Sequence, residues 1–175
     1  MRFLGWFSQR VEGIVMAELN PKHVQMVIDT INRGPYFRHL SMPVKELGKG
    51  YSLVELDIGN EHLNPFGGLH GGVYASAIDT AAYWAVYCEL DENVGLISLD
   101  LKVDYLAPAN TGKLIIKGRS IKVGKTICLA EATAFDQNDK WLAHGISKMM
   151  VTQGLQTIGD ALDFVGAQHL PPKFI

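Results

Sequence analysis

The sequence predicts an α+β domain in which one antiparallel β-sheet wraps around one buried α-helix. Two observations lead to this prediction. The stretch 73–88 is apolar or small almost throughout, which is typical of a helix that protein surrounds on every side. Four strand-like segments follow this stretch with no helix between them, and that order favours an antiparallel sheet over an alternating parallel fold.

The composition is that of an ordinary globular protein. The 175 residues fit one domain, and 47% of them are hydrophobic, which suffices for a sizeable core. The net charge of −2 provides no basic field for nucleic acid, so no nucleic-acid partner is expected. No apolar run reaches membrane-spanning length, and charged residues interrupt the start before a signal-peptide core can form. Together with two well-separated cysteines, Cys88 and Cys128, this predicts a cytoplasmic protein without a membrane partner.

The chain is expected to divide into three parts. These are an N-terminal helical extension at 1–40, the main domain at 41–152 and a C-terminal tail at 153–175. The tail carries a weak helical pattern that ends at the two prolines 171–172, and we assign it no function.

A helix is expected to begin at Asn20-Pro21. Asparagine is a common N-cap and proline is favoured at the first helical position, and apolar residues then recur with helical spacing up to Gly34. Ahead of this helix we expect a short lead-in over 1–19. Its Trp6 and Phe7 would pack either onto the domain or onto a partner subunit.

The main domain is expected to begin with a hairpin over 43–58, because Gly48-Lys49-Gly50 forms a turn signal between two strand-like runs. The clearest strand follows the apolar helix, where apolar and polar residues alternate from 97 to 105. Further strands are expected at 113–123, 126–136 and 141–151. Two strands, a buried helix and four strands in this order constitute the hotdog fold.

Asp79 is the most unusual residue, since it is the only charged residue within the apolar helix. Taking a carboxylate out of water costs several kcal/mol unless the group is paired, hydrogen-bonded or functional. One interpretation is a structural aspartate that bonds locally or to a strand across an interface. The other is a general base or a nucleophile.

His70-Gly71-Gly72 stands where this helix begins. The first backbone N–H groups of a helix lack acceptors and carry the positive end of the helix dipole, so Gly71 and Gly72 form a candidate oxyanion site. The alternative is a flexible helix entry, which any glycine pair allows. His70 is either a general base or a side chain that holds the preceding loop.

The spacing of Gly71 and Asp79 has a consequence for assembly. The two residues are eight positions apart, which is about 12 Å along a helix axis, so they cannot both contact one carbonyl carbon. If both act in catalysis, each active site must take its glycine from one chain and its aspartate from another across an isologous interface. This predicts a dimer.

Four other polar residues are weaker candidates. Asn64 either donates its amide to a substrate carbonyl or serves turn formation before Pro65. Ser98, expected on the polar face of its strand, either holds a water or has no role. Lys122 and Lys125 flank a hairpin turn, where they either contact phosphates or are simply solvated. No cluster has the spacing of metal ligands and no nucleotide-binding glycine motif is present, so neither a metal nor a cofactor is expected.

The stretch NPFGGLHGG at 64–72, followed by Asp79, resembles the signature of the phenylacetate-pathway-type hotdog acyl-CoA thioesterases. The resemblance continues in ISLDLKVDYLAPA at 97–109 and covers roughly 45–152. In this sequence Gly68 replaces a threonine that is frequent in the family. Tyr83 stands where some members have a small hydroxyl residue, and its larger side chain narrows the expected acyl pocket.

The resemblance implies a role for each matching residue. Asp79 takes the position of the acid that activates water or attacks the thioester, and the Gly71 N–H polarises the carbonyl. Asn64 is placed near the same oxygen, Ser98 positions the water and His70 is the histidine of the signature. Sites in the family lie between two subunits, which implies a homodimer or a dimer of dimers.

The expected reaction is the hydrolysis of an acyl- or aryl-acyl-CoA thioester to the free acid and CoA, in which coenzyme A is part of the substrate. We expect Gly72, Tyr83, Lys122 and Lys125 to contact that substrate. General-base and anhydride mechanisms both remain open. Two alternatives are a hotdog dehydratase or hydratase that acts on a related thioester, and a non-catalytic acyl-CoA-binding module.

Overall fold

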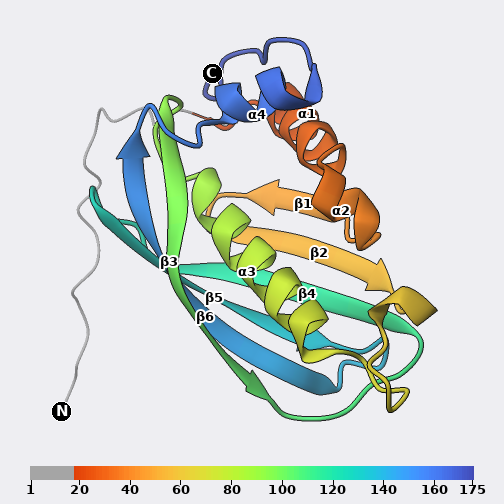
Figure 1. Cartoon of the computed structure of the whole chain (residues 1–175). Helices are drawn as coiled ribbons and strands as arrows, with labels where there is room; N and C mark the ends of the chain where they lie inside the picture. The colour runs from red at the N-terminus through yellow and green to blue at the C-terminus, as the bar shows by residue number, and fades with distance from the viewer. Residues whose placement is uncertain (1–17) are drawn as a thin grey trace, which may run out of the picture.

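The computed structural model describes residues 18–175 and contains a six-stranded antiparallel sheet curved around one long helix (Figure 1). The strands are β1 Val44–Gly48, β2 Tyr51–Asp57, β3 Val94–Tyr105, β4 Lys113–Lys122, β5 Ile127–Phe135 and β6 Trp141–Gln153. Their order across the sheet is β1-β2-β4-β5-β6-β3, so β1 and β3 form its edges. The predicted α+β hotdog fold is confirmed, and each expected strand is present.

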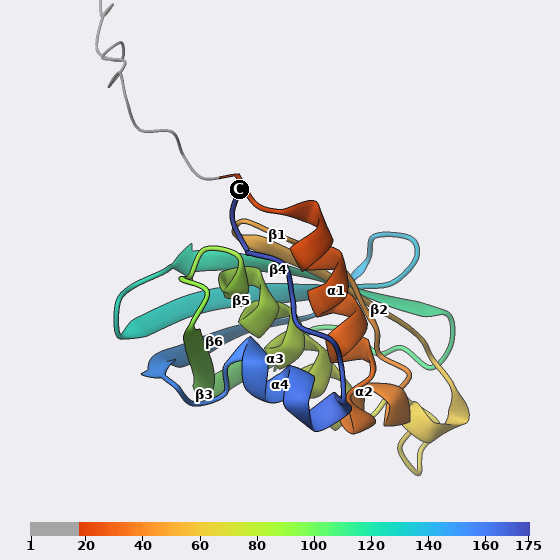
Figure 2. The same cartoon turned by 90° about the horizontal axis from the view of Figure 1, so that it is seen from above.

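The helices are α1 Pro21–Asn32, α2 Pro35–His39, α3 Gly71–Tyr87 and α4 Ile158–Val165, with a short 3-10 turn at Asn60–His62. The predicted N-cap of α1 is confirmed, because the Asn20 side chain accepts a hydrogen bond from the Lys22 N–H at 3.1 Å. Figure 2 shows α1 and α4 side by side above α3.

Trp6 and Phe7, for which we expected packing onto the domain or a partner subunit, lie outside the described residues. No helix within 18–175 is long and apolar enough to cross a membrane.

Helix α3 lies against the concave face of the sheet at very short range. Ala77, Ala81, Ala82 and Ala85 of α3 have no exposed surface. A Cβ atom on Gly118 of β4 would come within 2.2 Å of the Ala81 carbonyl oxygen, so only glycine fits at that position. The small residues that predicted a buried helix therefore let the sheet approach the helix backbone directly.

One face of α3 is open, contrary to the prediction that the helix is buried all round. The partly exposed side chains recur with helical spacing along this face: Ala75, Ser76, Asp79, Thr80, Tyr83 and Trp84. The sheet covers only one side of α3, and the other three helices cover the opposite side incompletely (Figure 1). Asp79 is consequently half-exposed instead of surrounded by apolar side chains.

The C-terminal segment is tied to the end of α3 by a buried lysine. Lys173 has no exposed surface, and its Nζ donates hydrogen bonds to the carbonyls of Tyr87 and Leu90 at 2.6 and 2.8 Å. These carbonyls belong to the last turn of α3 and the residues after it, where intrahelical donors are lacking. Next to Lys173, Phe174 forms a β-bridge with Leu19. The C-terminal segment, to which we assigned no function, is thus held against the end of α3 and against the residues that precede α1.

The stability contributed by Lys173 should depend on pH, because burial lowers the pKa of its ammonium group from 10.5 to about 8. Below pH 8 the group is charged in both the folded and the unfolded state. Between pH 8 and 10.5 the unfolded chain binds more protons than the folded one, so stability rises with pH in this window.

We therefore expect the free energy of unfolding of the wild type, minus that of Lys173→Met, to increase from pH 7.5 to pH 9.5. Urea unfolding at a series of pH values measures this difference, and groups that titrate in both proteins cancel from it. A difference that stays constant or decreases across the series would contradict the prediction.

Candidate active site

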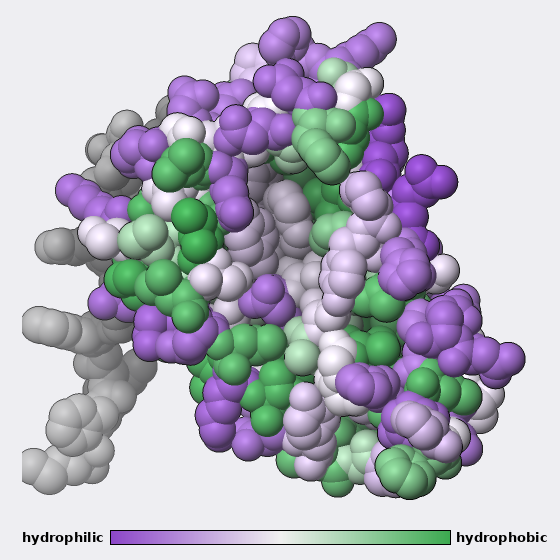
Figure 3. All heavy atoms as spheres, viewed as in Figure 1, coloured by the Kyte–Doolittle hydropathy of each residue, from purple (hydrophilic) through white to green (hydrophobic). Residues whose placement is uncertain are grey.

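Asp79 faces a pocket of about 600 Å³ on the open side of α3. Figure 3 shows the corresponding face of the molecule, which is hollowed near its centre with apolar side chains beside the hollow. The lining residues come from α2, α3, β3 and the segment before α4: Tyr36, Phe37, Ser76, Asp79, Thr80, Tyr83, Trp84, Ile97, Ser98 and Gln156. Asp79 is the only ionisable carboxylate among them, and no lysine or arginine accompanies it.

Two serine hydroxyls orient the Asp79 carboxylate. Ser98 of β3 donates to Oδ1 at 3.1 Å, with a longer contact of 3.4 Å to Oδ2. Ser147 of β6, which is fully buried, also lies 3.1 Å from Oδ1. Asp79 thus bonds to strands, as the structural interpretation expected, but Oδ2 keeps capacity to accept a hydrogen bond from a water in the pocket.

A β-bulge brings Ser98 to Asp79. The pairing of β3 with β6 shifts between Ser98 and Asp100, and an extra residue at a bulge changes which side chains face each side of the sheet. Ser98 therefore lies on the helix side, whereas strict alternation predicted it on the polar face. Leu99 was expected on the apolar face and is instead 50% exposed.

His70 caps the other end of the site-bearing helix. Its Nδ1 accepts a hydrogen bond from the Gly72 N–H at 2.8 Å, which favours a positioning role over that of a general base. Because His70 occupies the Gly72 donor, the Gly71 N–H is the donor that remains at the first helical position, where no intrahelical acceptor exists. The Tyr105 hydroxyl donates to the Gly71 carbonyl at 3.1 Å, so the end of β3 contacts this helix start.

A separate pocket of about 350 Å³ lies at this end of α3. Its lining is mostly apolar: Leu69, Gly71, Tyr74, Tyr105, Leu106, Ala107 and Pro108. The Tyr74 hydroxyl is buried there without a hydrogen-bond partner among the described residues. A buried hydroxyl without a partner is costly, so this end of the helix has an unused donor beside the Gly71 backbone.

Asn64 holds the loop that precedes α3. Its Oδ1 accepts hydrogen bonds from the N–H groups of Phe66 and Gly68 at 2.9 and 3.2 Å, and Gly67 between them has a φ of +79°. This geometry is that of an Asx-type turn. Asn64 Oδ1 therefore serves the expected turn, and donation of the Asn64 amide to a substrate carbonyl stays a prediction. The residue lies with His70 at the N-terminal end of α3.

Within one chain the predicted site residues fall in three places. Asp79, Ser98 and Tyr83 share one pocket, whereas Asn64, His70, Gly71 and Gly72 gather at the start of α3. Lys122 and Lys125 are exposed at the β4–β5 turn, and the two strands β5 and β6 separate β4 from β3. The structure therefore does not bring the two lysines to the Asp79 pocket of the same chain.

Ser147 is a site residue that sequence reasoning missed. It belongs to the inward-facing set of β6, in which Ala143, Gly145, Ser147 and Met149 alternate with more exposed residues. A serine in the buried phase of an otherwise apolar strand needs a hydrogen-bond partner, and Asp79 is the one charged residue of the otherwise apolar helix α3. The alternation along β6 could therefore have identified Ser147 as a buried polar residue that needs a partner.

Tyr83 occupies the position one turn after Asp79 and also lines the Asp79 pocket. Its hydroxyl donates to the Leu96 carbonyl at 3.1 Å, which holds the ring between α3 and β3. Burial raises the pKa of this hydroxyl to about 12, so it stays protonated and acts as a donor.

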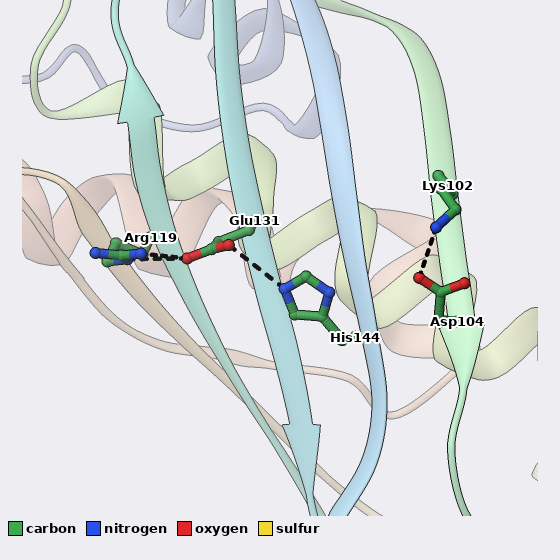
Figure 4. A network of polar contacts seen from close by, with 5 residues as sticks. All are labelled: Lys102, Asp104, Arg119, Glu131 and His144. Carbon is green, nitrogen blue, oxygen red and sulfur yellow. Dashed lines mark hydrogen bonds and ion pairs between the residues drawn. The ribbon is translucent and has the colours of Figure 1, made fainter.

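A second polar cluster lies on the outer face of the sheet, with α3 behind it (Figure 4). Arg119 Nε donates to Glu131 at 3.0 Å, His144 lies 3.4 Å from the same carboxylate, and Lys102 pairs with Asp104 at 2.8 Å. The neighbouring Arg119 lowers the pKa of the Glu131 carboxyl. Arg119, Glu131 and His144 interact across the adjacent strands β4, β5 and β6, whereas Lys102 and Asp104 pair within β3. This cluster is not a catalytic candidate.

Solved structures share this fold. A thioesterase of Haemophilus influenzae superposes with a TM-score of 0.68 at 21% identity, covering 72% of this chain and 88% of that one. A thioesterase family protein of Silicibacter pomeroyi gives the same TM-score at 23% identity, covering 74% of this chain and 98% of that one. At these identities the similarity establishes the fold.

Sequence comparisons establish the family. The model of the thioesterase superfamily matches residues 66–143. A protein of Saccharolobus solfataricus that bears an esterase name is 31% identical over 129 residues, covering 73% of this chain and 85% of the relative. Human acyl-coenzyme A thioesterase 13 is 30% identical over 92 residues, covering 52% of this chain and 63% of the relative. The chain belongs to the thioesterase superfamily, and its class of activity is thioester hydrolysis.

Proposed function

We propose that the protein hydrolyses acyl-CoA thioesters to the free acid and CoA, with Asp79 as the catalytic base. The observation that carries this proposal is a half-exposed carboxylate that two hydroxyls orient inside a pocket with an aromatic lining. The acyl-CoA substrate is supported by the name of the human relative and by the motif at 64–72.

In the proposed reaction Asp79 Oδ2 takes a proton from a water as the water oxygen attacks the thioester carbonyl carbon. The carbonyl oxygen gains negative charge, and a backbone N–H at a helix N-terminus stabilises that charge. The tetrahedral intermediate then releases the sulfur, and the proton on Asp79 passes to the leaving thiolate. The products are the carboxylic acid and CoA, and the Asp79 carboxylate is regenerated.

We propose that the oxyanion donor is Gly71 of a second copy of this chain. Asp79 and Gly71 of one chain are about 12 Å apart along α3, which is too far for one carbonyl group. Ser98 contacts Asp79 and Tyr105 contacts Gly71, and both lie on β3. Strand β3 therefore contacts both Asp79, near the middle of α3, and Gly71, at its start.

Pairing of two β3 edges supplies the required geometry. Strand β3 is 12 residues long and forms an edge of the sheet, and a long open edge is a template for strand pairing. An antiparallel pair around a two-fold axis near residues 101 and 102 sets Ser98 of one chain opposite Tyr105 of the other. The Asp79 of each chain then faces the Gly71 of its partner, and a homodimer has two equivalent sites.

The remaining predicted residues have supporting roles in this proposal. Asn64 and His70 shape the loop and the helix start that present Gly71, and Lys122 and Lys125 contact the CoA phosphates. We place the activity in the cytoplasm, because the buried free thiols Cys88 and Cys128 suit a reducing compartment.

Asp79→Asn should lower kcat for acyl-CoA hydrolysis by about 100- to 10,000-fold, because the amide cannot accept the proton from water. Release of the CoA thiol measures the rate. Asp139→Asn, at an exposed turn, is the matched control and should retain the activity of the wild type.

Single turnover in heavy-oxygen water should label only the acid product, and label in Asp79 would demonstrate an anhydride mechanism instead.

Gly71→Pro should lower kcat by about 100- to 1,000-fold, because proline removes the N–H at a helical position where its ring is tolerated. When inactive Gly71→Pro and Asp79→Asn chains are unfolded and refolded together, half of the random dimers are mixed, and each mixed dimer has one intact site of two. Activity should therefore recover to about a quarter of the wild-type level. No recovery on mixing would show that each site lies within one chain.

A further inference from the structure

A second cavity of about 410 Å³ lies directly beyond the Asp79 pocket, between the end of α3, the start of β3 and helix α4. The two cavities share Tyr83, Trp84 and Gln156 in their linings. Tyr83 comes four residues after Asp79, which is about 6 Å along the helix axis. A group bound beside Asp79 therefore needs to extend by about one helical turn to enter the second cavity.

The second cavity, here called the α4 chamber, offers an apolar and aromatic surface. Trp84 makes edge-to-face contacts with Tyr83 and Tyr87, with ring centroids 5.1 and 5.4 Å apart. Its lining contains no lysine, arginine or histidine. The one carboxylate in the lining, Asp160, caps α4 by accepting a hydrogen bond from the Thr157 N–H at 2.8 Å. The chamber suits an uncharged apolar group and has no partner for a second carboxylate.

Helix α4 is a fixed wall of this chamber. Thr157 and Asp160 form a reciprocal capping box, and Leu162 on the opposite face is buried. The Arg33 guanidinium at the end of α1 donates to the Val165 carbonyl at 3.0 Å. Helix α4 lies outside residues 66–143, the region that the superfamily model matches.

We propose that the α4 chamber binds the distal part of the acyl group, so that the preferred substrates carry a medium-length alkyl chain or an aryl group at the end of a short chain. This inference rests on the proposed thioesterase activity of the Asp79 pocket. Tyr83 is the positioning residue at the passage between the two cavities. Acyl groups as short as acetyl stay within the Asp79 pocket, and acyl groups that end in a carboxylate are disfavoured.

The test compares kcat/KM for acetyl-, octanoyl-, 3-phenylpropanoyl- and succinyl-CoA. The wild type should prefer the octanoyl and phenylpropanoyl thioesters. Ala161→Trp fills the chamber from α4 and should lower kcat/KM for these two by about tenfold or more, while acetyl-CoA hydrolysis changes by less than about threefold. Asp163→Trp places the same bulk on the exposed side of α4 and should leave all four values unchanged.

A second variant keeps the test decisive if Ala161→Trp does not fold. Phe164 lines the chamber and is 75% exposed, so Phe164→Arg places a cation at the rim without disturbing the core. The ratio of succinyl- to octanoyl-CoA hydrolysis should rise by roughly three- to fivefold.

The assignment of the chamber would be overturned if Ala161→Trp lowered kcat/KM equally for all four substrates. An unchanged ratio of succinyl- to octanoyl-CoA hydrolysis in Phe164→Arg would also overturn it. A wild type that favours acetyl-CoA would also overturn it, and the thioesterase activity would still stand. A wild type that hydrolyses none of the four thioesters would instead refute the proposed function itself.

Discussion

The close contact between α3 and the concave face of the sheet determines where everything else in this molecule can lie. Alanines on one side of α3 and glycines on the facing strands remove the side chains that would separate helix from sheet. At Gly118 and Gly145 an added Cβ would come within 2.2 and 2.7 Å of atoms in α3. A helix seated this deeply is enclosed on the sheet side only, so its opposite face has to be covered by other elements or remain open.

That depth explains why a carboxylate can be held in the middle of α3 by very short side chains. Asp79 lies at the boundary between the buried and the open face, within reach of the edge strand β3 and its neighbour β6. Ser98 and Ser147 extend only one carbon and one oxygen from their backbones, and both still reach Oδ1 at 3.1 Å. With a larger separation between helix and sheet, these two hydroxyls could not have oriented the only carboxylate in the lining of this pocket.

Features set by local sequence were predictable, and features set by contacts distant in sequence were not. Period-two alternation located the strands, and the apolar composition of 73–88 located α3, because each pattern records burial along one element. The bulge after Ser98 depends on the register against β6, so strict alternation placed Ser98 and Leu99 on the wrong faces. The role of Lys173 depends on carbonyls more than 80 residues away, which no local pattern encodes.

In the proposed reaction, catalysis and substrate choice depend on different parts of this chain. The catalytic candidates Gly71, Asp79 and Ser98 all lie within the 66–143 region that the superfamily shares. Part of the wall around them comes from outside this region: α2 contributes Tyr36, whose hydroxyl lies 2.6 Å from that of Ser76, and α4 closes the chamber beyond Tyr83. Because these flanking helices cover the open face of α3 without touching the Asp79 carboxylate, they can change in sequence and alter the accepted acyl group while the hydrolytic groups stay in place.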